Sequence, residues 1–248
     1  FEACLEVGKK LVGWEWHPAG TKRLPDGRLH GAAFRYQMCP RHSFIKWFCK
    51  LEYRNGKVHF PTQGPIAGWY GTECFTMIIA EELGIDYSDV VVDYDYRAQH
   101  SDEAGGSDGV TGQGWIVKEC ANKLKRKILE SCARQAQQPF IRTAFMNVPN
   151  NSPFKGYTAD DLDIKDGMVF LKSDPSKCVP FSQATLETVT ADYGGGSPKS
   201  RWNKGFGRQL DTMNTSWCEV AVDEETGEVE VLKYCVVADV GKIIRRTS

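Results

Sequence analysis

Residues 71–85 read GTECFTMIIAEELGI, and residues 107–114 read SDGVTGQG. The apolar residues of the first stretch recur at helical spacing, and Gly84 is typical of the position after a helix C-terminus, so this stretch predicts a helix. The second stretch is a glycine-rich loop that opens another helix near Gly114, and an apolar strand at 89–94 lies between the two helices. The first backbone N–H groups of a helix are unpaired, and the helix dipole is positive there. Two such loops predict a cradle for an anion, with a phosphate-bearing ligand as the first expectation.

The composition excludes several classes of protein. The chain has 248 residues, with 31 basic and 32 acidic side chains. This near-zero net charge argues against nucleic acid or a membrane surface as a partner held by bulk electrostatics. No apolar run approaches the roughly 18 residues of a membrane-spanning helix, and the N-terminus lacks the order of a signal peptide. We therefore expect a cytoplasmic protein.

The nine cysteines do not form the pattern of a metal site or of a disulfide framework. Their number is odd, and no two are spaced as Cys-x-x-Cys. Cys39 and Cys49 flank Pro40-Arg41-His42, but no second pair completes a metal site. We expect reduced, mostly buried thiols. Four histidines show no ligand spacing and are assigned no role, namely His17, His30, His42 and His59.

The remaining pattern predicts an α+β fold, with antiparallel hairpins and sheets packed with long helices on one face. Asn55-Gly56 predicts a type I′ turn, because both residues readily adopt the positive φ that this turn needs. Helices are expected at 1–13, 114–137 and about 180–189. Strands are expected at 30–38, 44–53, 58–61, 168–171, 216–222 and 228–240. Because the chain begins within a helix and stops soon after a strand, we expect a piece of a larger protein.

Five groups of residues occur in an order that is characteristic of one enzyme family. They are Glu2-Ala3-Cys4-Leu5 with Val12-Gly13-Trp14, Arg54-Asn55-Gly56-Lys57-Val58, Ile79–Ile85 with Ser88-Asp89-Val90, Gly106-Ser107 with Gly114, and Cys218–Asp223 with Thr226–Val229 and Ala238–Gly241. In these residues the chain resembles the molybdenum hydroxylases, the family of xanthine dehydrogenase, aldehyde oxidase and carbon monoxide dehydrogenase. The resemblance is to the molybdopterin-binding part of the large subunit. It covers nearly the whole chain, most weakly across 139–213.

The resemblance implies a molybdenum cofactor and a redox function. The family's cofactor is a molybdenum ion held by the dithiolene of a pyranopterin, often as a dinucleotide, so the protein needs no metal-ligand motif. The implied reaction is oxidative hydroxylation of a small-molecule substrate at an electron-poor carbon, with water as the oxygen source. Electrons then pass to Fe–S clusters and FAD on partner domains or subunits. By the same resemblance, residues 1–213 form the molybdopterin-binding region, and 214–248 start a β-hairpin that missing or partner sequence completes.

The resemblance places the cofactor contacts on two loops. The expected residues are Gly68, Trp69, Tyr70, Gly71 and Thr72 on the first loop, and Gly106, Ser107, Asp108, Gly109 and Thr111 on the second. The family's first loop reads Gly-Gln-Gly where this chain has Gly68-Trp69-Tyr70; with a one-residue insertion, its two glycines are Gly68 and Gly71. The literal Gly112-Gln113-Gly114 lies in the second segment, where spacing makes Gly114 the first residue of a helix.

Two other features of the family have no counterpart in this chain. The family's arginine-bearing loop, which contacts substrate, is absent, because Gly31-Ala32-Ala33-Phe34-Arg35 is predicted to be a strand. The glutamate thought to serve as general base lies close to the end of the large subunit, beyond any position matched here. No catalytic residue is therefore assigned to this chain.

These departures leave alternatives open. The same cofactor domain in a hydratase or reductase would fit Trp69-Tyr70 and the absent arginine loop, and a cofactor-free scaffold subunit would fit the altered first loop. Ser107-Asp108-Gly109 is alternatively an ordinary turn that opens a helix, and the Trp69 and Tyr70 rings alternatively pack beneath a loop. Gly194-Gly195-Gly196 lacks the strand-to-helix context of a phosphate loop and is predicted to be a surface or subunit-contact loop.

Overall fold

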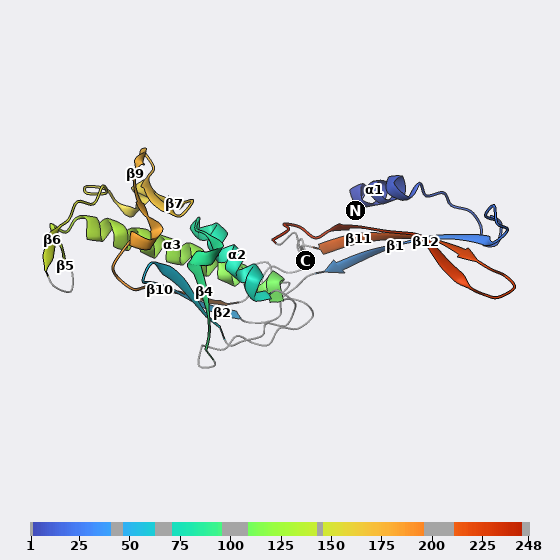
Figure 1. Ribbon diagram of the computed structural model, residues 1–248, viewed down its shortest axis with the longest axis horizontal. Helices are drawn as coiled ribbons and strands as arrows, with labels where there is room; N and C mark the ends of the chain where they lie inside the picture. Colours follow the sequence, from blue (N-terminus) through green and yellow to red (C-terminus); the bar gives the residue numbers. More distant parts are fainter. Residues whose placement is uncertain are drawn as a thin grey trace. The chain divides into compact units, whose positions relative to one another are not determined.

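The computed structural model describes residues 2–40, 47–62, 71–95, 109–142, 146–195 and 211–244. The chain forms two compact units (Figure 1). Unit 1 comprises Phe1–Arg41 and Arg208–Ile243, and unit 2 comprises His42–Gly207 and Ile244–Ser248. None of the helices in the described ranges is long and apolar enough to cross a membrane.

The elements of each unit follow the labels of Figure 1. The described residues of unit 1 form α1 (Glu2–Val12), β1 (Leu29–Pro40), β11 (Asp211–Val222) and β12 (Val229–Asp239). The helices of unit 2 are α2 (Gly71–Leu83), α3 (Gly114–Ala136), the π-helical turn η2 (Gly109–Gln113) and the 3₁₀ turns η1 (Tyr87–Asp89), η3 (Ala159–Asp161) and η4 (Phe181–Gln183). Its strands are β2 (Trp47–Arg54), β3 (Lys57–Thr62), β4 (Val90–Tyr94), β5 (Phe140–Arg142), β6 (Asn147–Pro149), β7 (Leu162–Lys165), β8 (Met168–Leu171), β9 (Asp174–Pro180) and β10 (Val189–Gly195).

The sheet of unit 1 has the order β1-β11-β12 with antiparallel neighbours, and α1 packs on it (Figure 1). The contact is close because Gly8 of α1 lies on Trp217: a Cβ at Gly8 would be 2.0 Å from the indole nitrogen. Trp217 is fully buried and stacks on Phe34, whose ring meets that of Trp14 edge-on. This aromatic cluster holds the helix on the sheet.

The predicted C-terminal hairpin is present, formed by β11 and β12. A strand from the N-terminal part of the chain lies beside it: β1 pairs with β11 from Leu29 opposite Val222 to Pro40 opposite Asp211. The hydrophobic pattern of a strand does not identify the strand beside it, so the sequence could not show this pairing. The assignment of 1–213 to cofactor binding, and the completion of the hairpin by missing or partner sequence, stay predictions.

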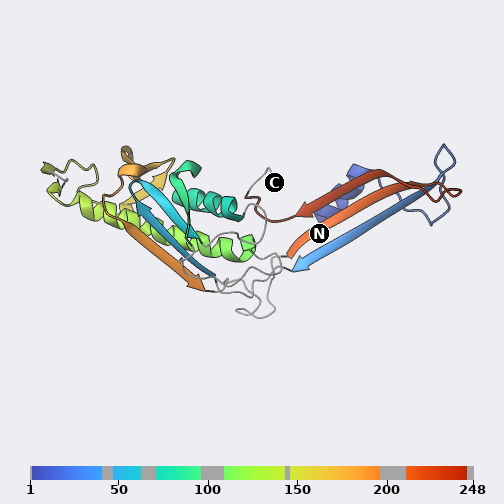
Figure 2. The same ribbon diagram turned by 60° about the horizontal axis from the view of Figure 1, so that its bottom comes forward.

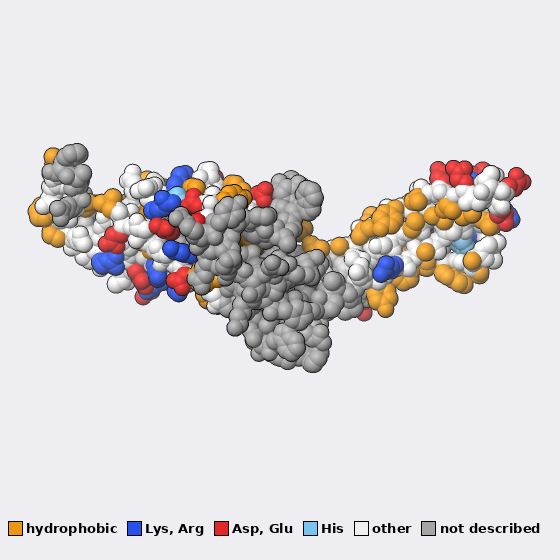
Figure 3. Space-filling view, turned by 90° about the horizontal axis from the view of Figure 1, so that it is seen from below, with side chains coloured by type: hydrophobic (Ala, Val, Ile, Leu, Met, Phe, Trp, Pro, Cys, Tyr) orange, Lys and Arg blue, Asp and Glu red, His pale blue; other side chains and the backbone are white. Residues whose placement is uncertain are grey.

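β12 is the edge strand of this sheet and exposes large apolar side chains. Those that are 41–64% exposed are Val229, Val231, Leu232, Tyr234 and Val236. Figure 3 shows hydrophobic side chains on the surface of unit 1, whereas charged side chains of both signs are spread over the visible surface of unit 2. An unpaired edge strand with apolar side chains is a surface that other protein segments can cover.

The core of unit 2 lies between a four-stranded sheet and two helices. The strand order is β10-β2-β3-β4, and α2 and α3 pack on one face of this sheet (Figure 2). Alternate strand residues face the helices, as Val58 and Phe60 do in β3. They pack with apolar helix residues such as Phe75 and Ile79 of α2 and Leu124 of α3. This arrangement confirms the predicted α+β fold with helices on one face.

One strand pair in this sheet is parallel. β3 and β4 run in the same direction, with Val58 opposite Val90 and Thr62 opposite Tyr94. Parallel neighbours need a crossover connection, which α2 supplies, so β3, α2 and β4 form a βαβ unit. We expected mainly antiparallel pairs, because hairpin turns can be recognised in a sequence and a crossover partner cannot. This parallel pair positions the candidate site.

Two predicted turns are confirmed. Between β2 and β3, Asn55 and Gly56 have φ values of +52° and +76°, as a type I′ turn requires. After α2, Gly84 has a φ of +69°, and the amide of Ile85 donates to the carbonyl of Ala80 at 3.0 Å, which closes a Schellman motif. Both turns follow from local sequence, because each needs a residue that tolerates positive φ.

The helix predicted at 180–189 is wrong. A single 3₁₀ turn forms there, η4, and the chain after it binds the C-terminal half of α3. The Thr185 hydroxyl lies 2.8 Å from the hydroxyl of Ser131, and the backbone N–H of Leu186 donates to the side-chain oxygen of Gln135 at 3.3 Å. These bonds to α3 take the place of the bonds that would continue a helix.

Candidate functional site

The two long helices of unit 2 begin at the same end. Gly114, the first residue of α3, lies against Phe75 and Ile78 of α2, because a Cβ there would be 3.9 Å and 3.2 Å from their side chains. One turn further along α3, Lys118 Nζ pairs with Glu82 Oε1 at 3.1 Å. Residues further along α3 therefore contact residues further along α2. The helices run parallel, with their N-termini at one end.

The strands that lead to these helices end at a common edge of the sheet. β3 connects through 63–70 to α2, and β4 connects through 96–108 to η2 and α3. Since β3 and β4 are parallel neighbours, their carboxyl ends lie side by side. In sheets of this kind the crevice outside the carboxyl ends of the strands is where ligands bind. Both predicted cofactor loops are thus attached to one sheet edge and to two adjacent helix N-termini.

The expected cofactor contacts lie partly within the described residues. Those outside them are Gly68, Trp69, Tyr70, Gly106, Ser107 and Asp108. Gly71 is the buried first residue of α2, and the carbonyl of Thr72 accepts a hydrogen bond from the Thr76 hydroxyl at 2.9 Å. Gly109 is the buried first residue of η2, which also contains Thr111. A role for these residues in cofactor binding stays a prediction.

The structure buries Gln113, a residue that its spacing in the sequence did not place in either cofactor loop. Gly114 begins α3 as predicted, and Gln113 is the last residue of the π-helical turn before it. Gln113 is only 6% exposed, and its Oε1 has no hydrogen-bond partner among the described residues. An unpaired buried acceptor costs about 1–3 kcal/mol. A ligand with a hydrogen-bond donor would remove that cost.

The charges at this end of the helices favour α3 as the terminus that faces an anion. The first turn of α2 carries Glu73, whereas the first turn of α3 carries no acidic side chain. The charge of Lys118, one turn further, is compensated by Glu82. No group of three or more His, Cys, Asp or Glu side chains that could hold a metal ion occurs among the described residues.

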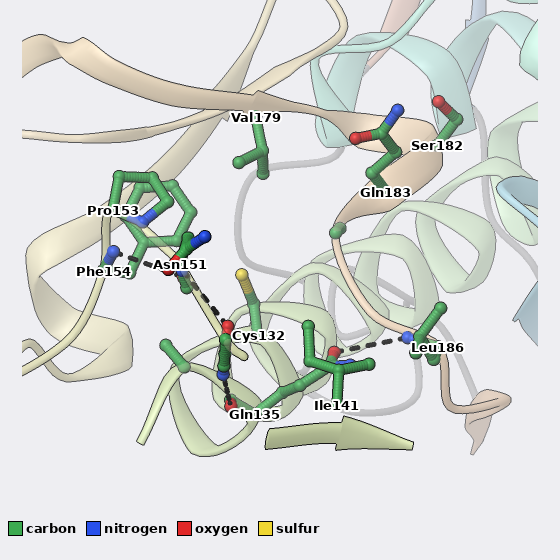
Figure 4. Close-up of a pocket in the computed structure, with 14 residues that line it drawn as sticks. Cys132, Gln135, Ile141, Asn151, Pro153, Phe154, Val179, Ser182, Gln183 and Leu186 are labelled. Carbon is green, nitrogen blue, oxygen red and sulfur yellow. Dashed lines mark hydrogen bonds between the residues drawn. The ribbon is translucent and has the colours of Figure 1, made fainter. Parts of the chain in front are cut away.

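A hollow lies towards the C-terminal end of α3 (Figure 4). Its volume is about 480 Å³, and amide, hydroxyl and apolar groups line it, with no charged side chain among them. Burial raises the pKa of the Cys132 thiol in its wall to about 12, so this thiol stays protonated and is a poor nucleophile. An α-helix rises about 1.5 Å per residue, which puts Cys132 on the order of 27 Å along α3 from Gly114. The hollow is therefore no part of the cradle at the helix N-termini.

Two histidine contacts arise from the fold and not from any sequence spacing. His59 Nδ1 lies 2.8 Å from Asp93 Oδ2, on the strands β3 and β4. In unit 1, His17 Nε2 and His30 Nδ1 are 2.8 Å apart. Because each contact joins separate elements, inspection of neighbouring residues could not have found it.

A comparison with protein-family models identifies the chain. Residues 53–248 match the family described as the molybdopterin cofactor-binding domain. The chain belongs to this family. The matched range contains α2, η2, α3 and both predicted cofactor loops. No curated protein is similar enough to this molybdopterin cofactor-binding domain to give a match.

Three solved enzymes are similar to this domain in structure. Quinoline 2-oxidoreductase from Pseudomonas putida 86 has a TM-score of 0.63 at 16% identity, over 98% of this chain and 29% of that one. Reconstituted CO dehydrogenase from Oligotropha carboxidovorans has a TM-score of 0.64 at 15% identity, over 87% of this chain and 26% of that one. The aldehyde oxidoreductase from Desulfovibrio desulfuricans has a TM-score of 0.53 at 17% identity, over 99% of this chain and 23% of that one.

The family match confirms the predicted molybdopterin-binding domain, and the solved enzymes have a similar fold. A second structure of CO dehydrogenase is described as that of a Cu,Mo enzyme, so molybdenum occurs in one of the similar proteins. The molybdopterin cofactor-binding domain described here shares their fold, at identities that show fold alone. It spans less than a third of the length of each enzyme.

Proposed function

We propose that this chain supplies part of the molybdopterin site of a molybdenum hydroxylase-type oxidoreductase. The main support is that the strands before the two predicted loops, β3 and β4, end side by side at one sheet edge, within the range that matches the family. Segments 63–70 and 96–108 both start at carboxyl ends of parallel strands and both end at N-termini of parallel helices. Unpaired backbone N–H groups and helix dipoles at such an edge suit the phosphate of a pterin cofactor.

The residues at this edge suit the cofactor in composition as well as position. The pterin brings its own sulfur ligands for the metal, and the described residues offer no competing metal-binding cluster. In the proposal, Ser107 presents its hydroxyl to the phosphate, and Gly109 and Gly71 present backbone N–H groups, the latter from α2. Trp69 and Tyr70 line the cofactor or the path of the substrate. When bound, the cofactor supplies the molybdenum centre for oxidative hydroxylation with oxygen from water; this chain binds and orients it.

Other parts of the same enzyme supply the remaining functions in this proposal. The general base, the Fe–S clusters and FAD belong to other segments or subunits, and the substrate is a small molecule. The share of the solved enzymes that this chain covers, 29% or less in the three structures, supports such an arrangement. The exposed apolar side chains of β12 give those segments a surface to pack against.

Metal analysis and the fluorescence of oxidised pterin test the proposal on the native assembly purified through this chain. We expect molybdenum and pterin in amounts close to that of the chain. Ser107→Trp should lower both, because a bulky ring in the second loop blocks the phosphate. Ser173→Trp, at an exposed position in the turn after β8, is the matched control and should leave both unchanged. An assembly free of molybdenum, tungsten and pterin would refute the proposal and favour a cofactor-free scaffold.

A hydratase or reductase that uses the same cofactor is the second candidate. The replacement of Gly-Gln-Gly by Gly68-Trp69-Tyr70 favours it, because a bulky ring takes the place of an amide that donates and accepts hydrogen bonds. Oxygen-labelled water separates the chemistries. Hydroxylation puts the label into the product and delivers electrons to an acceptor, hydration puts it there without electrons, and reduction consumes electrons without the label.

A further inference from the structure

We propose that Gln113 recognises the pterin ring, with its buried side-chain oxygen accepting a hydrogen bond from an N–H donor of the cofactor. The inference rests on the proposed function and deepens it. It assigns a role to a residue that is not among the expected cofactor contacts. It also separates recognition of the ring from recognition of the phosphate, which falls to the loop before η2.

Gln113 is buried, and its side-chain oxygen has no hydrogen-bond partner among the described residues. Oε1 of Gln113 is the one hydrogen-bond acceptor among the buried side-chain atoms that lack a partner within the described ranges. Buried hydroxyls elsewhere in unit 2 have partners: that of Thr76 donates to the carbonyl of Thr72, and that of Ser131 lies 2.8 Å from that of Thr185. Buried polar groups in folded proteins nearly always have a partner, so a donor for this oxygen is expected in the working protein.

The side-chain oxygen of Gln113 lies at the start of α3. η2 lies directly before α3 and contacts α2 and β2. Gln113 occupies the N-cap position of α3, yet its side chain makes no capping hydrogen bond. Single π-helical turns are rare and occur frequently at functional sites. The amide is therefore enclosed at the N-terminal end of α3, which follows the second predicted cofactor loop, and beside α2, which follows the first.

The partner of this oxygen must be a hydrogen-bond donor. A phosphate group ionised at neutral pH offers acceptors, so it cannot satisfy an unpaired acceptor. A pterin ring offers amino and ring N–H donors beside nitrogen and oxygen acceptors. A primary amide both accepts and donates, so it can pair with such a ring edge. The unpaired Oε1 of Gln113 thus points to the ring of the cofactor.

The proposal predicts effects of opposite sign with and without cofactor. Gln113→Met keeps the length of the side chain and removes its polar atoms. In cofactor-free protein this removes an unpaired buried acceptor, so the thermal midpoint should stay the same or rise. In loaded protein it removes one hydrogen bond to the cofactor, and pterin should dissociate faster by roughly tenfold.

The experiment uses the assembly that contains this chain, as purified and after removal of the cofactor. Gln113→Met is compared with wild type and with Gln183→Met, a matched control. Gln183 is exposed on η4, in the hollow towards the other end of α3 (Figure 4). The rate of pterin loss, followed by fluorescence, reports on recognition. Thermal unfolding with and without cofactor reports on stability.

Faster pterin loss from Gln113→Met, with no loss of cofactor-free stability and an unchanged Gln183→Met, supports the proposal. Pterin loss at the wild-type rate overturns it. So does an equal loss of stability in the loaded and cofactor-free forms, because Gln113 is then paired within the chain. If Gln113→Met does not assemble, Gln113→Asn, which keeps the amide but withdraws it by one methylene, decides by the same measurements. A wild-type assembly without pterin overturns the proposed function as well, whereas the other negative results leave that function standing.

Discussion

Gly84 ends α2 against the backbone of β7, and replacing it with alanine should weaken this junction. A Cβ at Gly84 would lie 2.5 Å from the carbonyl oxygen of Ile164 and 3.0 Å from the Cα atom of Lys165. Both are main-chain atoms, so no side-chain rotation can relieve the overlap. Gly84→Ala must therefore move α2 away from β7 or distort one of them.

Two costs contribute to this change, and a second glycine separates them. Gly84 and Gly167 have φ values of +69° and +72°, so alanine at either position incurs the left-handed penalty of about 1–2 kcal/mol. A Cβ at Gly167 meets nothing within 4 Å. At Gly84 the overlap adds about 1–3 kcal/mol. We expect a loss of about 2–5 kcal/mol for Gly84→Ala and about 1–2 kcal/mol for Gly167→Ala.

Hydrogen exchange measures this difference at the junction itself. The chain has two compact units, so a single unfolding midpoint would combine them. The amide of Ile85 donates to the carbonyl of Ala80 at 3.0 Å, directly after Gly84, and its protection reports on the end of α2. This protection should fall further in Gly84→Ala than in Gly167→Ala, by about 1–3 kcal/mol. Equal losses in the two variants would refute the close approach of α2 to β7.

Three further predictions concern side chains of unit 2. The hydrogen bond from the Ser131 hydroxyl lowers the pKa of the Glu187 carboxyl below 4.5. The ionised carboxylate therefore stabilises the folded protein above pH 4.5, and this stabilisation is lost as the pH falls through the lower folded-state pKa. The difference in thermal midpoint between wild type and Glu187→Gln should therefore shrink from about pH 6 to about pH 3, and a constant difference would contradict this. Iodoacetamide at about pH 8 should label the partly exposed Cys178 and spare Cys132, because burial raises the pKa of the Cys132 thiol to about 12. Peptide mass spectrometry measures the labelling, and equal labelling of the two cysteines would contradict this prediction. Asn150→Ala should destabilise unit 2 by about 1–3 kcal/mol in urea unfolding. The side-chain N–H groups of Asn150 donate to two backbone carbonyls at the end of α3, both at 2.8 Å. An unchanged free energy of unfolding would show that these hydrogen bonds do not stabilise the unit.

The features that could be predicted from the sequence have local causes. The spacing of apolar residues indicated α2 and α3, and the glycines at 71 and 114 indicated where they begin. Asn55-Gly56 indicated its turn because positive φ suits these residues. The helix predicted at 180–189 failed where side chains of α3 offered the backbone other partners.

The candidate site could be predicted only in part. Glycine-rich segments before two helices predicted where the cofactor loops lie, which stays a prediction, and the order of motifs indicated the family. That the loops share one sheet edge depends on the parallel pairing of β3 and β4, which no turn signal announces. Gln113 was excluded by its spacing, and its burial became visible only when η2 was packed against α2 and β2.

The sequence alone therefore specified α1, α2 and α3, the tight turns, the family and the segments proposed as the candidate loops. Packing of the folded chain set the rest: β1 lies beside β11, β3 runs parallel to β4, and the amide of Gln113 is enclosed. The reason is the range over which the forces act. Backbone preferences and side-chain periodicity operate within a few residues, and each stretch of sequence contains them. Strand pairing and burial join residues as distant in the chain as Leu29 and Val222, and no local pattern encodes which distant segments will meet.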